Sequence, residues 1–293
     1  MAAFAGKAPS QHPTWSPAAV ELARLLDLPM AARGPIRYRP EFVENYIPNE
    51  SWLMPPGVSA ELSRLGVLAA PRRIGAYADQ VLSDLLVDLS WNSCRLEGNR
   101  YSAHAAAELL NGGALRCDVD TVMLLNHRAA VEFLADSVSQ EGLSALVLRN
   151  VHAILMRDLV PDNGTLGAIR QGTLGIAGTL YSPMQERDVI EAMLDSIVEK
   201  AARIENPVEA ALFLWIQLAY LQPFESGNER TSRLAANIPL LLHSCTPLTF
   251  QNVTRDDYTL AMLAIYELRD ATLAADLASW TYQRSVTKWA AGR

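Results

Sequence analysis

The 293-residue chain is short of cysteine, of basic charge and of long apolar runs. Its three cysteines, Cys94, Cys117 and Cys245, lack CxxC spacing and are too few for a disulfide framework. They indicate reduced thiols, so we expect a cytoplasmic protein. Lys and Arg number 25 against 32 Asp and Glu, which gives a net charge of −7. Because no basic block is present, we expect no nucleic acid among the partners.

The longest apolar run, residues 208–221, is bounded by Pro207 and Pro223. It is too short to cross a bilayer, so it predicts a buried helix, and we expect no membrane partner. The N-terminus also lacks the uninterrupted apolar segment of a signal peptide. Half of the residues are apolar and 19% are charged, a composition that excludes disorder as the overall state.

Helical periodicity dominates the chain from Ile74 onward. It predicts helices at residues 82–97, 102–110, 119–137, 145–159, 185–203, 207–222 and 231–243, and a last pair within 256–288. Residues 172–181 alternate in hydrophobicity and predict a short hairpin loosened by glycines. The expected fold class is therefore all-α, a helical bundle with one short β-hairpin and an N-terminal extension.

The composition divides the chain into three parts. Residues 1–34 contain several prolines near their start and are expected to be a flexible N-terminal tail and lead-in. Residues 35–115 hold a proline-rich extended segment followed by the first strongly periodic helices. Residues 116–293 contain the remaining helices and the hairpin.

One segment suits anion chemistry: Gln222-Pro-Phe-Glu-Ser-Gly-Asn-Glu-Arg-Thr-Ser-Arg233. A buried helix runs into a Gly-Asn turn, and a new helix begins directly afterwards. The free amides at that helix start favour an anion, and Gly227 allows its close approach. Arg230 and Arg233 are three residues apart, so both face one side, where two guanidinium groups suit a phosphate chain or a carboxylate. The structural alternative is a solvated or salt-bridged helix junction.

This segment resembles the signature loop of the Fic family, His-Pro-Phe-x-Asp/Glu-Gly-Asn-Gly-Arg-x-x-Arg. Ser93-Cys-Arg-Leu-Glu97-Gly-Asn99 is similar to the family's autoinhibitory motif, Ser/Thr-x-x-x-Glu-Gly/Asn. Further resemblances are to the family's N-terminal region, its flap and its C-terminal helices, at residues 38–56, 167–183 and 258–285. The resemblance implies a Fic-type helical bundle. In it, residues 35–115 are the N-terminal Fic-associated region with the inhibitory helix, and residues 116–293 are the Fic core with the C-terminal helices.

Members of the family typically transfer AMP, or another phosphate-containing group, from a nucleotide to a hydroxyl side chain. The resemblance implies ATP or another nucleotide as the donor, with the amides of Gly227 and Asn228 on its α- and β-phosphates and Arg230 on the phosphate chain. Arg233 would meet the γ-phosphate or, in its absence, Glu97, through a salt bridge that blocks the donor. A protein or small-molecule hydroxyl acceptor would dock on the flap at residues 172–183, and the resemblance also allows a homo-oligomer.

Three positions of the loop depart from the family pattern. Gln222 stands at the position of the catalytic His, and a primary amide cannot accept the hydroxyl proton near neutral pH. Loss of a general base lowers the rate by about 100- to 10,000-fold. Ser226 replaces the acidic residue that carries magnesium and is a weak ligand for a hard cation. Glu229 replaces the second glycine and adds negative charge beside the phosphates.

Three glutamates are candidates for a substitute base: Glu225, Glu229 and Glu97. Their structural alternatives are solvent-facing loop acids for the first two and a simple lock on Arg233 for Glu97. Three functions therefore stay open. The first is an altered Fic-type transferase of AMP or another phospho-group, autoinhibited by Glu97. The second is a catalytically inactive module that senses a nucleotide or binds a peptide, and the third is a Fic fold used for a small-molecule reaction.

Overall fold

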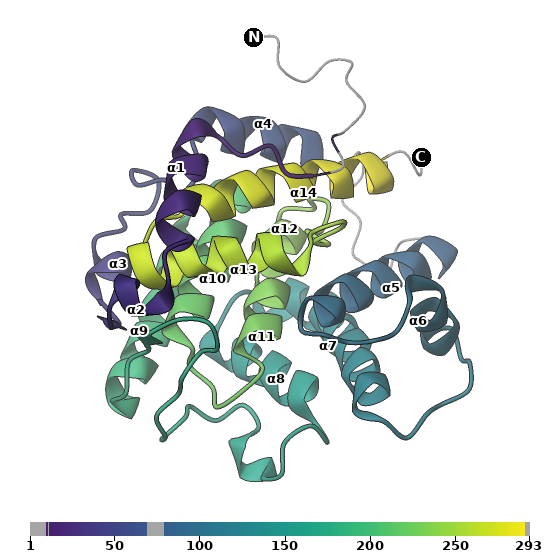
Figure 1. Cartoon of the computed structure of the whole chain (residues 1–293). Helices are drawn as coiled ribbons and strands as arrows, with labels where there is room; N and C mark the ends of the chain where they lie inside the picture. The colour runs from purple at the N-terminus through teal and green to yellow at the C-terminus, as the bar shows by residue number, and fades with distance from the viewer. Residues whose placement is uncertain (1–9, 11, 69–78, 291–293) are drawn as a thin grey trace.

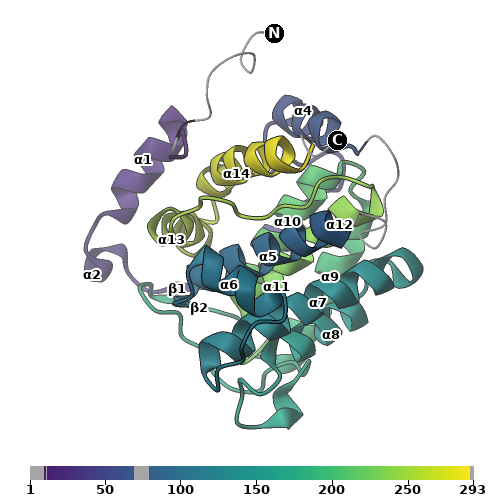
Figure 2. The same cartoon turned by 90° about the vertical axis from the view of Figure 1, so that its right-hand side faces the viewer.

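A computed structural model describes residues 10, 12–68 and 79–290 (Figures 1 and 2). The chain is mostly helical, as its sequence predicts. The helices are α1 (Pro17–Leu26), α2 (Met30–Arg33), α3 (Glu41–Glu44), α4 (Pro56–Gly66), α5 (Asp79–Leu96), α6 (Ala103–Leu110), α7 (Val119–Glu141), α8 (Ala145–Met156), η2 (Asn163–Thr165), α9 (Arg187–Arg203), α10 (Pro207–Leu221), α11 (Asn228–Ala235), α12 (Asn237–Leu242), α13 (Arg255–Leu263), η3 (Ala264–Leu268) and α14 (Thr272–Ala290).

Helix α10 is the centre of the bundle, and each of its side chains is buried. Asn206 caps it, because its side-chain oxygen accepts from the N–H groups of Val208 and Glu209 at 2.9 and 3.0 Å. Pro207 occupies the first helical position, where its fixed φ suits the helix. Helices α4, α9, α11, α12 and α14 all pack against α10, so the core forms around this one apolar helix.

The proline-rich segment before α4 is tied to α10 through one buried carboxylate. Glu209 accepts from the hydroxyl of Tyr46 at 3.0 Å and from the N–H groups of Leu53 and Met54 at 2.6 and 3.3 Å. These donors offset the cost of burying a charged group, since a buried carboxylate is tolerated when it is hydrogen-bonded. The extended segment therefore covers the core, as its composition suggested.

The lead-in to the core begins with a packed helix. Helix α1 is capped by Ser16 and packs on α14, beside α13 (Figure 1). The N–H of Ser16 also donates to Asp276 on α14 at 2.8 Å. The predicted tail and lead-in thus contains a packed helix at residues 17–26, whereas residues 1–9 and 11 lie outside the described residues. The domain boundaries placed after residues 34 and 115 stay predictions.

The hairpin predicted at residues 172–181 is wrong. The structure describes this whole segment, and its only strand residue is the first of β2 (Tyr181–Ser182). Strand β2 pairs in parallel with β1 (Ile36–Arg37), and the N–H of Tyr38 donates to the carbonyl of Ser182 at 2.9 Å. Glycines weaken strands, and an isolated two-stranded hairpin is marginally stable. The end of the loop is therefore stabilised by the N-terminal segment instead.

Four tyrosine rings stack in a row from this small sheet toward the 222–233 region. Tyr38 stacks on Tyr220 with ring centroids 4.9 Å apart, Tyr220 on Tyr181 at 4.9 Å, and Tyr181 on Tyr266 at 5.3 Å. Tyr266 lies on η3, a π-helical turn, and such turns occur frequently at functional sites. The row thus connects the N-terminal segment with Tyr266, whose hydroxyl contacts Glu229 in the 222–233 segment.

The helix predicted at residues 231–243 is two helices. Helix α11 begins at Asn228, earlier than predicted, and the break before α12 falls at Ala236. The early start follows from Gly227, whose φ of 69° ends the preceding loop. As a result, Arg230 lies in the first turn of α11.

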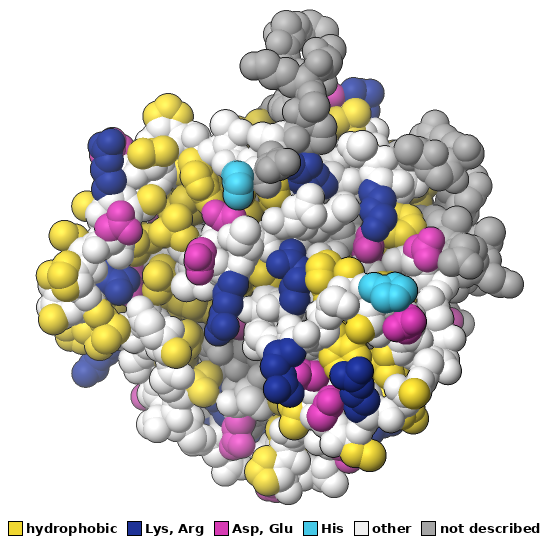
Figure 3. Space-filling model, turned by 45° about the vertical axis from the view of Figure 1, so that its right-hand side comes forward, with side chains coloured by type: hydrophobic (Ala, Val, Ile, Leu, Met, Phe, Trp, Pro, Cys, Tyr) yellow, Lys and Arg dark blue, Asp and Glu magenta, His cyan; other side chains and the backbone are white. Residues whose placement is uncertain are grey.

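The described helices include none that is long and apolar enough to span a membrane. On the face shown in Figure 3, Lys and Arg side chains lie beside Asp and Glu side chains. The surface of that face is therefore mixed in charge and shows no basic stripe.

Candidate functional site

The loop between α10 and α11 is closed by its own side chains. Gln222 ends α10 in the left-handed region with a φ of 51°. The Asn228 side chain accepts from the N–H of Phe224 at 2.9 Å and donates to the carbonyl of the same residue at 2.7 Å. A Cβ on Gly227 would lie 2.3 Å from the sulfur of Met156, so only glycine fits this turn. The sequence predicted a role for the Asn228 amide but not this bracing by its side chain.

His152 on α8 packs against the loop and holds it by hydrogen bonds. Its Nδ1 accepts from the N–H of Gly167 at 3.0 Å, so Nε2 carries the proton and donates to the carbonyl of Ser226 at 3.0 Å. Its ring stacks on Phe224 with centroids 3.9 Å apart. Burial lowers the pKa of His152 to about 4, which keeps the imidazole neutral at pH 7. This contact could not be predicted from the sequence, because it depends on how α8 packs.

A buried arginine joins the loop to both ends of the predicted flap. The Arg170 guanidinium donates to the carbonyl of Gln222 at 2.7 Å, to that of Gly172 at 3.0 Å and to that of Met184. These three carbonyls belong to the loop, to the start of the flap segment and to its end. Arg170 therefore fixes the flap segment relative to the loop.

Glu97, just beyond α5, lies between the two arginines of α11. Its Oε1 is 2.5 Å from Nη2 of Arg233, and its Oε2 is 2.9 Å from Nε of Arg230. The Arg233 and Arg230 side chains are only 1% and 5% exposed, so this carboxylate neutralises two desolvated cations. The predicted Glu97–Arg233 ion pair is therefore present. Arg230 is a second partner that the sequence did not suggest.

Several buried polar atoms near this ion pair have no hydrogen-bond partner within the described part of the chain. They are Nη1 of Arg230, Nη1 of Arg233 and both ring nitrogens of His127. Burial, together with the two nearby arginines, lowers the pKa of His127 to about 3. Buried polar atoms are almost always paired in folded proteins, so this group of unpaired donors and acceptors is unusual among the described residues.

Glu229 points into the site, in contrast to the alternative of a solvent-facing acid. It accepts hydrogen bonds from the hydroxyls of Tyr258, at 2.5 Å, and Tyr266, and from Nε2 of Gln222 at 3.3 Å. Nη1 of Arg233 lies 3.9 Å from its Oε2. Burial raises the pKa of Glu229 above that of an ordinary glutamate. The sequence marked this position as unusual, whereas its tyrosine partners could not be predicted.

The Gln222 side chain is engaged as a donor. Besides Glu229, its Nε2 has the carbonyl of Ala219 at 2.8 Å and the hydroxyl of Tyr266 at 3.2 Å within hydrogen-bond distance. An amide nitrogen has no lone pair available for a proton. The position of the family's base thus holds a group that orients its neighbours and does not titrate.

The residues at the predicted metal position do not suit magnesium. Ser226 and Glu225 are both exposed, and a serine hydroxyl is a poor ligand for a hard divalent cation. In the parts of the chain that the structure describes, no three His, Cys, Asp or Glu side chains gather closely enough to hold a metal ion. The residues of this loop are therefore not assigned a metal-binding role.

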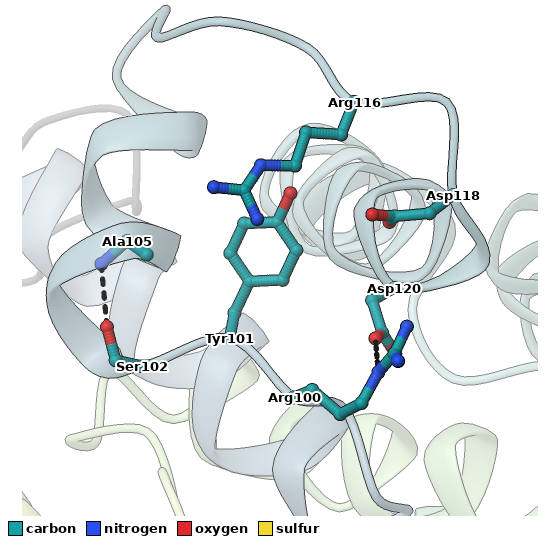
Figure 4. Close-up of a pocket in the computed structure, with 7 residues that line it drawn as sticks. All are labelled: Arg100, Tyr101, Ser102, Ala105, Arg116, Asp118 and Asp120. Atoms are coloured by element: carbon teal, nitrogen blue, oxygen red, sulfur yellow. Dashed lines mark hydrogen bonds and ion pairs between the residues drawn. The ribbon is translucent and has the colours of Figure 1, made fainter.

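A hollow that the sequence did not predict lies beside α6 and the start of α7, away from the 222–233 loop (Figure 4). Its volume is about 320 Å³, and Arg116 lies over the ring of Tyr101 at 5.4 Å. Arg100 pairs with Asp120 at 2.6 Å, and Asp118 caps α7. Because acidic and basic side chains line it together, it favours no single ligand charge. It shares no lining residue with the 222–233 loop.

Comparisons with known proteins identify relatives of this architecture. Residues 142–240 match the model of the Fic/DOC family. A Fic family protein from Desulfovibrio desulfuricans G20 is similar in structure, with a TM-score of 0.65 and 19% identity over 84% of this chain and 77% of that one. A fragment of Fic-1 from C. elegans has a TM-score of 0.61 and 19% identity over 81% and 69% of the two chains. A Fic domain-containing signaling protein from Bacteroides thetaiotaomicron VPI-5482 has a TM-score of 0.60 and 20% identity over 81% and 96%.

Proposed function

Because residues 142–240 belong to the Fic/DOC family, we propose that this chain binds a phosphorylated nucleotide at the loop between α10 and α11. It transfers a phosphate-containing group from that donor to a hydroxyl acceptor, and Glu97 keeps the donor out until it is displaced. The observation that carries the proposal is the Glu97 carboxylate between the buried guanidinium groups of Arg230 and Arg233.

The two arginines offer more donors than one carboxylate can use. Glu97 accepts from one nitrogen of each, and Nη1 of both has no hydrogen-bond partner among the residues that the structure describes. A phosphate chain has more acceptor oxygens than a carboxylate, and guanidinium groups bind phosphates through paired charge-assisted hydrogen bonds. Glu97 belongs to the turn that follows α5 and not to the loop, so it can leave while the loop keeps its shape. The first amides of α11 add further donors for an anion.

In the transfer, the acceptor oxygen forms a bond to a donor phosphorus. The bond from that phosphorus to its bridging oxygen breaks, and the remaining phosphate part of the donor leaves. Of the three candidate glutamates, Glu229 is the one best placed to take the hydroxyl proton, because its carboxylate contacts Gln222 at the position of the family's base. Its raised pKa suits proton transfer closer to neutral pH.

Gln222 favours a second candidate function, a module that binds the nucleotide without transferring any part of it. The amide nitrogen of Gln222 is committed to its neighbours, and Glu229 is held by two tyrosine hydroxyls. A site that keeps its phosphate-binding residues but restrains the acid beside Gln222 would bind a nucleotide without reacting with it.

The test compares donor binding and transfer in the full chain. We expect Glu97→Gly to bind labelled nucleotides at least about tenfold more tightly than the wild type, because two buried cations become available. Adding Arg230→Ala should abolish that gain, whereas Arg64→Ala, on the exposed side of α4, should not. No binding by any variant would overturn the proposal. Binding without label transfer or release of the leaving phosphate would select the second candidate.

A further inference from the structure

We infer that the site takes a pyrophosphate diester without a metal, such as a nucleoside diphosphate joined through its outer phosphate to a second group, in preference to a magnesium-bound nucleoside triphosphate. This inference rests on the proposed nucleotide site and names the chemical class of its ligand. It follows from the charges that remain around Arg230 and Arg233 once Glu97 has been displaced.

While Glu97 occupies the site, the two positive charges of Arg230 and Arg233 are matched by the negative charges of two carboxylates. Glu97 contacts both arginines, and Glu229 lies 3.9 Å from Nη1 of Arg233. When a ligand replaces Glu97, Glu229 stays, because it is part of the same helix turn as Arg230. The incoming anion therefore meets one excess positive charge rather than two. Each additional negative charge on the ligand is then repelled at close range by Glu229.

The hydrogen bonds around Glu229 indicate that it is ionised. Tyr258 donates to Oε2, while Tyr266 and the Gln222 amide donate to Oε1. Both oxygens therefore act as acceptors, which is the pattern of a carboxylate, since a protonated acid would use one oxygen as a donor. The nearby Arg233 favours the same state. Glu229 therefore repels the ligand in the state that the ligand first meets, before any proton is transferred to it.

A triphosphate ends in a phosphate with an additional negative charge and normally binds with magnesium, which shields that charge. At the metal position this chain offers the exposed hydroxyl of Ser226, which cannot hold the ion firmly. In a pyrophosphate diester each phosphate carries a single negative charge, and both can be held by hydrogen bonds alone. The loss of the metal ligand and the gain of Glu229 thus both disfavour a magnesium-bound triphosphate, and the diester avoids both penalties.

The test uses pairs of ligands that share a base. Binding of ADP-ribose and ATP, and of UDP-glucose and UTP, is measured calorimetrically on full-length Glu97→Gly with and without magnesium. For the nucleobase that binds more tightly, we expect the diester to bind at least about tenfold more tightly than the triphosphate of the same nucleobase. Magnesium should change triphosphate binding less than about threefold. In Glu97→Gly/Glu229→Gln, triphosphate binding should strengthen by about tenfold while diester binding changes little.

The matched control is Glu97→Gly/Glu225→Gln, which removes one negative charge from the same loop at an exposed position. This variant should keep the preference for the diester over the triphosphate unchanged. Thermal unfolding checks that each variant is folded. Equal binding of the two classes, or tighter binding of the magnesium-bound triphosphate, overturns the inference while leaving the proposed nucleotide site intact. Failure of all four ligands to bind overturns both.

Discussion

The side-chain amide of Gln222 donates a hydrogen bond to the carboxylate of Glu229 at 3.3 Å. In the family's signature loop these positions hold the catalytic His and a glycine. The chain thus lacks a titratable group at one position and has gained one at the other, and the fold brings the two side chains into contact. The substitutions are therefore best understood together, as one altered site.

Restoring the histidine alone should not restore ordinary AMP transfer. In a Glu97→Gly background, Gln222→His still lacks a metal ligand at Ser226 and keeps the negative charge of Glu229. We expect Gln222→His/Ser226→Asp/Glu229→Gly to transfer label from ATP at least about 100-fold faster than Gln222→His. If the two variants transfer at the same rate, our interpretation of positions 226 and 229 is wrong.

Removing the carboxylate of Glu97 should destabilise the fold, because it leaves two buried guanidinium groups without their counter-ion. We expect Glu97→Gln to lower the free energy of unfolding by about 1–3 kcal/mol, less than for a fully buried pair because Glu97 is 24% exposed. Urea unfolding measures the loss. Inorganic pyrophosphate should then raise the melting temperature of the variant more than that of the wild type, since a ligand stabilises the state it binds. An equal effect on both proteins would contradict a site opened at Arg230 and Arg233.

A methyl group at Gly227 should disrupt the loop. Gly227→Ala combines a φ of 69° with a Cβ 2.3 Å from the Met156 sulfur, and we expect a loss of about 1–3 kcal/mol. The control is Gly57→Ala in α4, where a Cβ meets nothing within 4 Å and φ is ordinary. That control should be neutral or stabilising by up to about 1 kcal/mol. Equal stability of the two variants would show that the turn tolerates side chains.

Replacing His127 by an apolar residue should stabilise the protein. Both ring nitrogens are buried and have no partner in the described part of the chain, so His127→Leu removes an unpaired polar group and should add about 1–2 kcal/mol at pH 7. The exposed control His104→Leu should change stability by less than about 0.5 kcal/mol.

The advantage of His127→Leu should grow in acid. The pKa of His127 is lowered from 6.5 to about 3, so below pH 6.5 the unfolded chain binds a proton that the folded chain does not. This residue therefore removes stability from the wild type as the pH falls from 6.5 toward 3, by at most about 1.4 kcal/mol per pH unit. Urea unfolding at pH 7 and pH 5 measures the difference, and an unchanged advantage at both would contradict a buried neutral His127.

Features set by local sequence could be predicted. The helices predicted to start at residues 102 and 207 begin there or one residue later, and Ser102 and Asn206 cap them. The spacing of Arg230 and Arg233 put both on one face of a helix, and family resemblance put Glu97 opposite Arg233. Each of these depends on a few neighbouring residues, or on a motif whose members keep their order.

Features set by tertiary packing could not be predicted. Tyr258 and Tyr266 reach Glu229 from 29 and 37 residues further along the chain. His152 and Arg170 brace the loop through contacts that no local pattern encodes. The hairpin prediction failed for the same reason, because alternation at residues 172–181 cannot reveal that the strand's partner is Ile36–Arg37.

The docking of α2 has a consequence for synthesis of the protein. Arg33 forms its ion pair with Glu267, which lies 234 residues later in the chain. On the ribosome, the N-terminal helices are therefore made long before their partners α13, η3 and α14 exist. Folding that depends on such distant contacts is slow, and it leaves apolar surface uncovered while it waits. The extension is thus made before the helices on which it docks, and its apolar side chains stay uncovered until those helices have been synthesised.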